Sequence, residues 1–251
     1  MNKALKKIVC ITLCLASIST VFAQYKMRPV EELINKSDPG WVFVKQWIDS
    51  AKNQIEILEP DSAKAKQALY RTQVTTRSAM GAIVYNTGGI LVDHGWIRIL
   101  GSGCSKMQRT LPDWNKGKAF KEFGDRPNFF LIADDAAGGF FAINYGSIGS
   151  GFDSVYYLAP DDLEWEPLDM MYEDFIWFCF NGELENFYTG IRWKSWKQDM
   201  AGLKADEMFH IFPPLWTKEG KDIEVDMKKP VPAEELFTYD LEMRKQLDFE
   251  K

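Results

Sequence analysis

The sequence holds few of the side chains that form metal centres and nucleophilic active sites. Only His94 and His210 occur in 251 residues, and no three or four histidines and cysteines stand at the short spacing of a zinc site. Cys104 could act as a nucleophile with His94 as its base, but the pattern supplies no third orienting group. Gly138-Gly139 joins two predicted strands without a following helix, unlike a phosphate loop. We therefore predict no metal and no cofactor.

Basic residues are outnumbered, and no compact basic patch occurs. The chain has 30 lysines and arginines against 36 aspartates and glutamates, a net charge of −6. Such a surface repels phosphate backbones and anionic membranes, so nucleic acid is excluded as a partner. Repeats, linkers and low-complexity tracts are also missing, so one domain is expected over residues 24–251.

A single apolar run is present, at the beginning of the chain. Lys3, Lys6 and Lys7 precede the run at residues 8–23, which ends with Val21-Phe22-Ala23. The run is shorter than the ~20 residues of a membrane-spanning helix. The pattern predicts a secretory signal peptide at residues 1–23, cleaved after Ala23. We expect an exported protein, periplasmic or secreted, with no membrane span after cleavage.

Cysteine is scarce outside this leader. Cys10 and Cys14 depart with it, which leaves Cys104 and Cys179. In an oxidising compartment these two could form a disulfide. A buried free thiol is an equally natural state for Cys179, which lies between Phe178 and Phe180.

The hydrophobic patterns change from helical to strand-like and back along the chain. After a short helix-like segment at residues 29–35, two helices are predicted first, at residues 41–51 (with Asp38 as N-cap) and 63–73. Strands are then expected at residues 80–85, 90–93, 95–100, 129–133, 140–144, 155–158 and 163–168. Helices return at residues 172–180, 192–203 and 232–247. This order predicts an α+β fold, in which N-terminal and C-terminal helices pack on an antiparallel sheet of five to seven strands.

Several segments resemble a bacterial family catalogued as domain of unknown function 2625. They include residues 129–144 (FFLIADDAAGGFFAIN), 156–165 (YYLAPDDLEW) and 187–193 (FYTGIRW). Residues 95–103 (GWIRILGSG) and 111–115 (LPDWN) are similar too. The resemblance covers most of the chain beyond the leader and implies no catalytic residues.

A more distant similarity is to the SUKH superfamily of α+β binding modules. It rests on residues 138–180, where a Gly-Gly strand, a tyrosine-containing strand with an acidic turn, and a helix follow one another. The likeness implies a SUKH-like fold and a partner-binding role. The export signal and the long helices at the end of this chain depart from that pattern.

Acidic and aromatic residues supply the candidate binding groups. Asp134 and Asp135 lie in the turn of a predicted hairpin, where solvated turn acids are the commoner interpretation. Arg98 lies on a predicted strand and is a candidate functional cation. Tryptophans can anchor sugars or protein partners, although they can equally fill a core. The aromatic candidates, with the arginine beside them, are Trp165, Arg192, Trp193 and Trp196, and the last three are expected to be partly exposed.

Two functions remain open. The first is a non-catalytic exported module that binds a protein or an envelope component such as a glycan. The alternative is an envelope polysaccharide hydrolase that uses a carboxylate pair ~5–9 Å apart, with Asp134 and Asp161 as residues to test.

Overall fold

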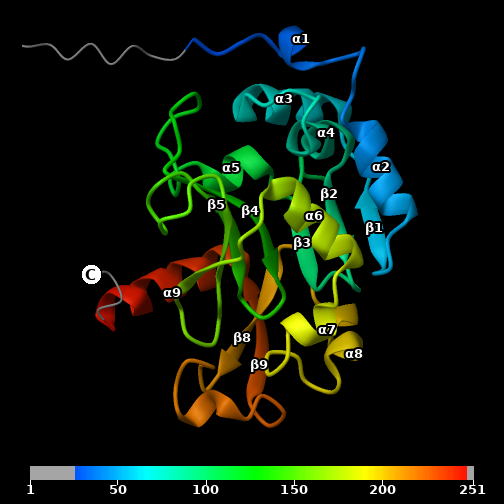
Figure 1. Cartoon of the computed structure of the whole chain (residues 1–251). Helices are drawn as coiled ribbons and strands as arrows, with labels where there is room; N and C mark the ends of the chain where they lie inside the picture. The colour runs from blue at the N-terminus through cyan, green and yellow to red at the C-terminus, as the bar shows by residue number, and fades with distance from the viewer. Residues whose placement is uncertain (1–25, 248–251) are drawn as a thin grey trace, which may run out of the picture.

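The computed structural model describes residues 26–247, and a seven-stranded antiparallel sheet forms its centre (Figure 1). The strands lie side by side in the order in which they occur in the chain. They are β1 (Ile55–Leu58), β2 (Gly89–Val92), β3 (Ile97–Leu100), β4 (Phe129–Asp135), β5 (Phe140–Asn144), β6 (Val155–Leu158) and β7 (Trp165–Pro167). The predicted α+β class and antiparallel sheet are confirmed, whereas the predicted leader lies outside the described residues.

Helices precede and follow the sheet, as predicted (Figure 1). None of the helices in the described part of the chain is both long and apolar enough to span a membrane. The α-helices are α1 (Val30–Leu33), α2 (Trp41–Asp49), α3 (Ser62–Thr72), α4 (Ala79–Asn86), α5 (Leu111–Asn115), α6 (Tyr172–Asn181), α7 (Leu184–Phe187), α8 (Trp196–Asp199) and α9 (Ala233–Gln246). Two 3₁₀ turns are η1 (Met200–Gly202) and η2 (Glu219–Lys221).

Three local predictions are wrong. Residues 80–85 form helix α4 rather than a strand, because the Ser78 hydroxyl caps the helix by accepting the Gly81 N–H at 3.1 Å. Helix α2 begins after Gly40, so Asp38 is not its N-cap. Residues 192–203 are helical only from Trp196 onward, in α8 and η1.

A second, two-stranded sheet was not predicted. It pairs β8 (Glu207–Phe212) with β9 (Met227–Pro232) in antiparallel register. Strand β9 contains Pro230 and Pro232, and proline counts against a strand because it has no N–H to donate. The small sheet joins the main body where the Phe209 N–H donates to the Ala136 carbonyl at 2.8 Å.

The core extends over both faces of the central strands. Every residue of β2, β3, β5 and β6 is buried, and in β4 only Phe129 is partly exposed. Antiparallel sheets often leave one face in water. Here α6 packs on Phe141 and α9 on Phe140, adjacent residues of β5 whose side chains point to opposite faces, so both faces are covered and polar side chains on these strands enter the interior.

Candidate binding site

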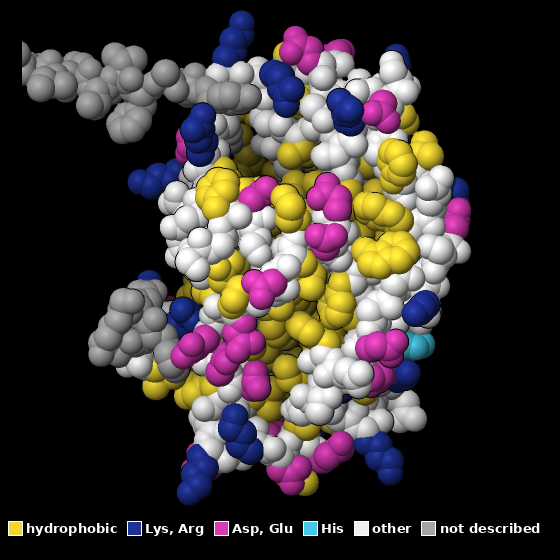
Figure 2. All heavy atoms as spheres, in the orientation of Figure 1, with side chains coloured by type: hydrophobic (Ala, Val, Ile, Leu, Met, Phe, Trp, Pro, Cys, Tyr) yellow, Lys and Arg dark blue, Asp and Glu magenta, His cyan; other side chains and the backbone are white. Residues whose placement is uncertain are grey.

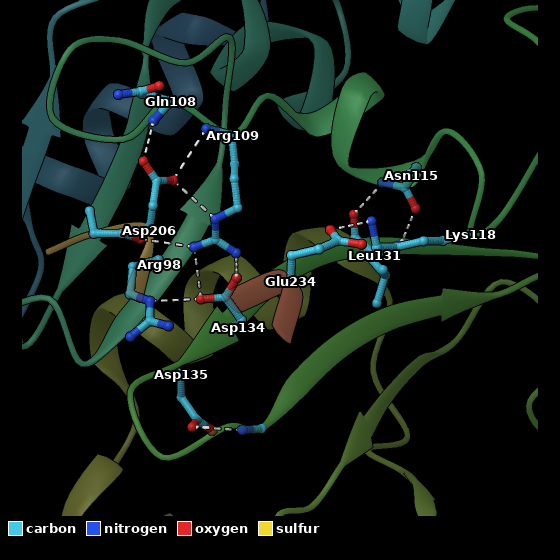
Figure 3. Close-up of polar contacts among 12 residues, drawn as sticks. Arg98, Gln108, Arg109, Asn115, Lys118, Leu131, Asp134, Asp135, Asp206 and Glu234 are labelled. Carbon is cyan, nitrogen blue, oxygen red and sulfur yellow. Dashed lines mark hydrogen bonds and ion pairs between the residues drawn. The ribbon is translucent and has the colours of Figure 1, made fainter. Parts of the chain in front are cut away.

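Asp134 lies at the centre of a buried ion network (Figure 3). Strand pairing sets Arg98 of β3 directly opposite Asp134 of β4. The Arg98 Nε donates to the Asp134 carboxylate at 2.6 Å, and the Arg109 guanidinium contacts the other carboxylate oxygen. Arg98 and Asp134 have side chains 1% and 0% exposed. The candidate cation Arg98 is therefore neutralised inside the protein.

Arg109 connects this network to the segment before β8. Its Nε donates to Asp206 at 3.1 Å, and one of its terminal nitrogens donates to the Ala205 carbonyl at 2.8 Å. The Asp206 carboxylate also accepts the Gln108 N–H at 2.7 Å (Figure 3). Arg109 thus ties the loop after β3 to the small sheet.

Asp135 is also buried, but its carboxylate orders the β4–β5 turn. One oxygen accepts the N–H groups of Ala137 and Gly139, each at 2.9 Å, and the other accepts the Tyr157 hydroxyl at 2.7 Å. Burial raises the pKa of Asp135, while the Tyr157 hydroxyl and the two N–H groups act in the opposite direction.

Asp134 and Asp135 are therefore not solvated turn acids, and this expectation is wrong. Both side chains are 0% exposed. All four of their carboxylate oxygens have partners within the protein. The two acids hold strands and loops together, and no substrate could reach them in this structure.

Trp193, Trp196 and the side chain of Arg192 are buried as well, contrary to the expectation of partial exposure. Trp193 and Trp196 are 3% and 5% exposed, and the Arg192 side chain is 4% exposed. The Arg192 guanidinium carbon lies 4.0 Å from the centre of the Trp196 ring and 4.8 Å from that of Trp96. Its charge is balanced by Asp93, 2.7 Å away. This cation–π cluster closes the core beside the β2–β3 turn and offers no anchor to a ligand.

Cys104 and Cys179 are free thiols in the structure, so the proposed disulfide is not formed. Cys179 is completely buried in α6, and burial raises the pKa of its thiol well above the ordinary value. Cys104 is partly exposed.

Trp165 is the one predicted binding residue that lines a large groove. The groove has a volume of about 980 Å³ and lies between α9, the loop after β5 and the first residue of β7. Trp165 is half-buried, and its ring centre lies 6.4 Å from that of Phe129. The other lining residues are Gly117, Lys118, Phe129, Ser147, Ile148, Gly149, Glu164, Glu234, Phe237, Thr238, Leu241, Glu242, Arg244 and Lys245.

Asn144 shapes one wall of the groove. Its side-chain oxygen accepts the N–H groups of Gly146, Ser147 and Ile148, at 2.8 to 3.1 Å. Its side-chain nitrogen donates to the carbonyls of Gly149 and Gly151. One buried amide therefore fixes the whole loop that faces α9.

Lys118 and Glu234 form a fixed ion pair on the opposite side. The Lys118 ammonium lies 2.7 Å from Glu234 and 4.2 Å from the centre of the Trp114 ring. The Arg109 guanidinium packs on the same ring at 4.8 Å. The Trp114 ring thus connects this wall of the groove to the buried network around Asp134. Because this pairing joins residues far apart in sequence, no local pattern could have indicated Lys118 or Glu234.

The groove is lined by both apolar and charged side chains, a combination that suits ligand binding more than metal coordination. It exposes apolar rings beside carboxylates and ammonium groups, the usual combination in ligand sites. Within residues 26–247, no three histidine, cysteine or acidic side chains are grouped as metal ligands would be.

Comparison with known proteins gives a family but no activity. The model of a family described as "Protein of unknown function DUF2625" matches residues 30–236. An "Uncharacterized protein" of Haemophilus influenzae is 40% identical over 203 residues, which cover 81% of this chain and 88% of the relative. The "Putative uncharacterized protein YbfG" of Escherichia coli strain K12 is 38% identical over 218 residues, or 87% of this chain and 98% of the relative. No solved structure matches, and the SUKH-like similarity stays a prediction.

Proposed function

Because the chain belongs to the family described as "Protein of unknown function DUF2625", whose description assigns no activity, we propose a function from the groove itself. The protein is an exported, non-catalytic module that binds an envelope component in the groove between α9 and Trp165. The observation that carries the proposal is a half-buried tryptophan in a groove of about 980 Å³, flanked by charged groups of both signs.

A glycan is the ligand that this chemistry favours. An aromatic ring such as Trp165 provides a flat apolar surface on which the face of a sugar can pack. Glu164, Glu242 and Lys245 are exposed around it and can exchange hydrogen bonds with hydroxyl groups. A protein partner is the other occupant, and the binding experiment distinguishes the two.

The predicted leader supports export. Its lysines, apolar run and Val21-Phe22-Ala23 fit a cleaved signal peptide. Expression of the full gene product should yield periplasmic or secreted protein beginning at Gln24. Mass spectrometry of fractionated cells tests this, and intact protein that retains Met1 in the cytosol would contradict it.

A hydrolase is the second candidate function, because carboxylates line the groove. Glu164, Glu234 and Glu242 line it together with Trp165, so carboxylates do lie beside an aromatic ring. Glu234 is already paired with Lys118, which leaves Glu164 and Glu242 as the acids for such a reaction. Neither Asp134 nor Asp135 could take part, because both are buried and bonded.

Trp165→Ala tests the binding proposal. We expect it to weaken binding of soluble peptidoglycan fragments roughly tenfold or more, measured by isothermal titration calorimetry, because the anchor ring is lost. Trp177→Ala is the matched control, since Trp177 is 46% exposed on α6 and lies outside the groove.

The outcomes separate the candidates. Equal loss in both variants, or no glycan binding by the wild-type protein, would contradict the glycan module. Capture of an envelope protein that Trp165→Ala no longer retains would identify a protein partner. Release of reducing sugar that disappears in Glu164→Gln or Glu242→Gln would establish the hydrolase instead.

A further inference from the structure

A second hollow lies on the other side of the loop that precedes β4. It has a volume of about 380 Å³ and shares no lining residue with the groove. At about 30 Å³ for each water-sized group, it has room for roughly a dozen non-hydrogen atoms. Its lining comes from the end of α3 and the residues after it, the start of α4, the loop before β4, β4 itself and the residue after β5. The lining residues are Arg71, Thr72, Gln73, Val74, Met80, Phe120, Gly124, Asp125, Arg126, Pro127, Phe130 and Tyr145.

The inner wall of this hollow is apolar. Met80 and Phe130 are buried in the core, and Phe120 stacks on Phe130 with ring centres 6.3 Å apart. Val74 and Tyr145 are half-buried at its sides. Burial and the nearby Asp153 raise the pKa of Tyr145 to about 12, so its phenol stays neutral and adds no negative charge.

The rim carries two arginines and one aspartate, and the charge of Arg71 is offset by Asp113. Arg71 lies 2.6 Å from Asp113, and its guanidinium packs 4.7 Å from the centre of the Phe123 ring. Arg126 is exposed and forms no ion pair with any residue between 26 and 247. Asp125 is the one acidic lining residue, and its carboxylate is bonded to the Glu122 N–H at 2.8 Å.

Charged side chains are distributed unevenly over the face shown in Figure 2. Figure 2 shows hydrophobic side chains at the bottom of a recess beside α3, with Lys and Arg side chains, and some Asp and Glu side chains, around it. Acidic side chains are concentrated lower on the same face (Figure 2). A negatively charged ligand would therefore meet less repulsion at the recess than over that lower region.

We propose that this hollow binds a small amphipathic anion, an acyl carboxylate whose chain packs on Met80, Phe120 and Phe130 and whose carboxylate pairs with Arg126. An apolar pocket with a few polar groups at its mouth is the usual form of such a site. A chain of about ten carbons matches the volume. The site is separate from the proposed glycan groove, so either proposal can fail without the other.

Three ligands with the same ten-carbon chain test the proposal: decanoate, decanol and decyltrimethylammonium. Isothermal titration calorimetry on the purified protein should give the tightest binding for decanoate and the weakest for the cation. Arg126→Glu should weaken decanoate binding roughly fivefold and leave decanol binding unchanged, because only the charge contact is lost. Lys194→Glu is the control, since it makes the same change at an exposed position outside the hollow.

A second variant tests the cavity itself. Val74→Trp fills the hollow from its side and should weaken the binding of decanoate and decanol alike. Equal affinity for the anion and the cation, equal effects of Arg126→Glu and Lys194→Glu, or no binding of decanoate below its micelle concentration would each overturn the proposal. If Val74→Trp does not fold, the comparison of Arg126→Glu with Lys194→Glu still tests the proposal.

Discussion

At the scale of single residues, the burial of charged side chains is the feature that could not be predicted from the sequence. Asp134 and Asp135 follow one another, and side chains of adjacent strand residues point to opposite faces. An aspartate at a hairpin is explained by turn preference as well as by a buried ion pair. The residue types therefore could not show whether these side chains are exposed or buried. The deciding partners, Arg98 and Arg109, lie 36 and 25 residues away in the chain from Asp134.

Asp134→Asn should destabilise the protein strongly. Arg98 would remain fully buried without its opposite charge, and breaking such a pair costs about 3–5 kcal/mol. Urea unfolding followed by tryptophan fluorescence measures the free energy of unfolding. Asp49→Asn is the control, because the Asp49 pair with Lys45 is 60% exposed on both sides and should contribute less than about 1 kcal/mol. Similar losses in the two variants would show that Asp134 does not hold Arg98.

Asp240→Asn should stabilise the protein at neutral pH, in contrast to Asp134→Asn. Asp240 on α9 is 5% exposed, and burial, with a smaller contribution from Asp135, raises its pKa well above the ordinary value. Its folded pKa exceeds its unfolded pKa, so its contribution to stability is present in acid and is lost as the pH rises toward the folded pKa.

The expected gain from Asp240→Asn is on the order of 1 kcal/mol or more at pH 7–8 and close to zero near pH 3. Thermal unfolding across this range measures it. His210 and Tyr239 line the same small cavity, so His210→Gln serves as a parallel measurement of any change that comes from the histidine. A gain that is constant with pH would mean that Asp240 does not titrate as described.

At the scale of secondary structure, hairpins were the most predictable elements and short apolar runs the least. Polar turns separated the strands from β2 to β7, and the Pro232 and glutamate signals placed α9 correctly. Residues 80–85 are apolar on every side, and periodicity cannot distinguish a buried helix from a buried strand in so short a run. The Ser78 cap was the one local signal for α4.

Asn115 exemplifies a tertiary contact that completes a strand. Between Leu131 and Ala133 the pairing of β4 with β5 shifts by one residue, and β3 pairs with β4 only from Ala133 onward. The Leu131 N–H and carbonyl are left for the Asn115 side chain, which bonds them at 2.7 and 2.8 Å (Figure 3). Helix α5 thereby supplies the hydrogen bonds that a neighbouring strand would otherwise make to Leu131.

Asn115→Leu should therefore lower the free energy of unfolding by about 2–4 kcal/mol, because two buried backbone groups lose their partners at similar side-chain volume. Urea unfolding provides the measurement. Asn86→Leu is the control, since Asn86 donates one hydrogen bond within its own helix. Equal effects would mean that Asn115 contributes no more than a local contact.

At the scale of the whole molecule, a central run of antiparallel strands with helices before and after it was predictable, but strand β1, the β8–β9 sheet and the closure of the core were not. The tryptophans at residues 193 and 196 are buried through contact with Trp96 and Arg192, and the only candidate left in a groove is Trp165. Whether a ring lies in the core or in a groove depends on which distant segment covers it. Sequence alone therefore identified one residue of the candidate groove, Trp165, but not which of the candidate side chains are accessible.

The reactivity of the two thiols measures how tightly the core is closed. Cys104 is partly exposed, whereas Cys179 is buried in α6 beneath contacts from several parts of the chain. With a thiol reagent in native buffer we expect Cys104 to react within minutes and Cys179 to react only at the rate at which the whole domain opens. Cys104→Ser isolates the second reaction, and its rate should rise with urea in parallel with global unfolding. Rapid labelling of Cys179 without denaturant would mean that α6 opens independently of the sheet, and no labelling of either residue after unfolding would mean that the two cysteines are joined.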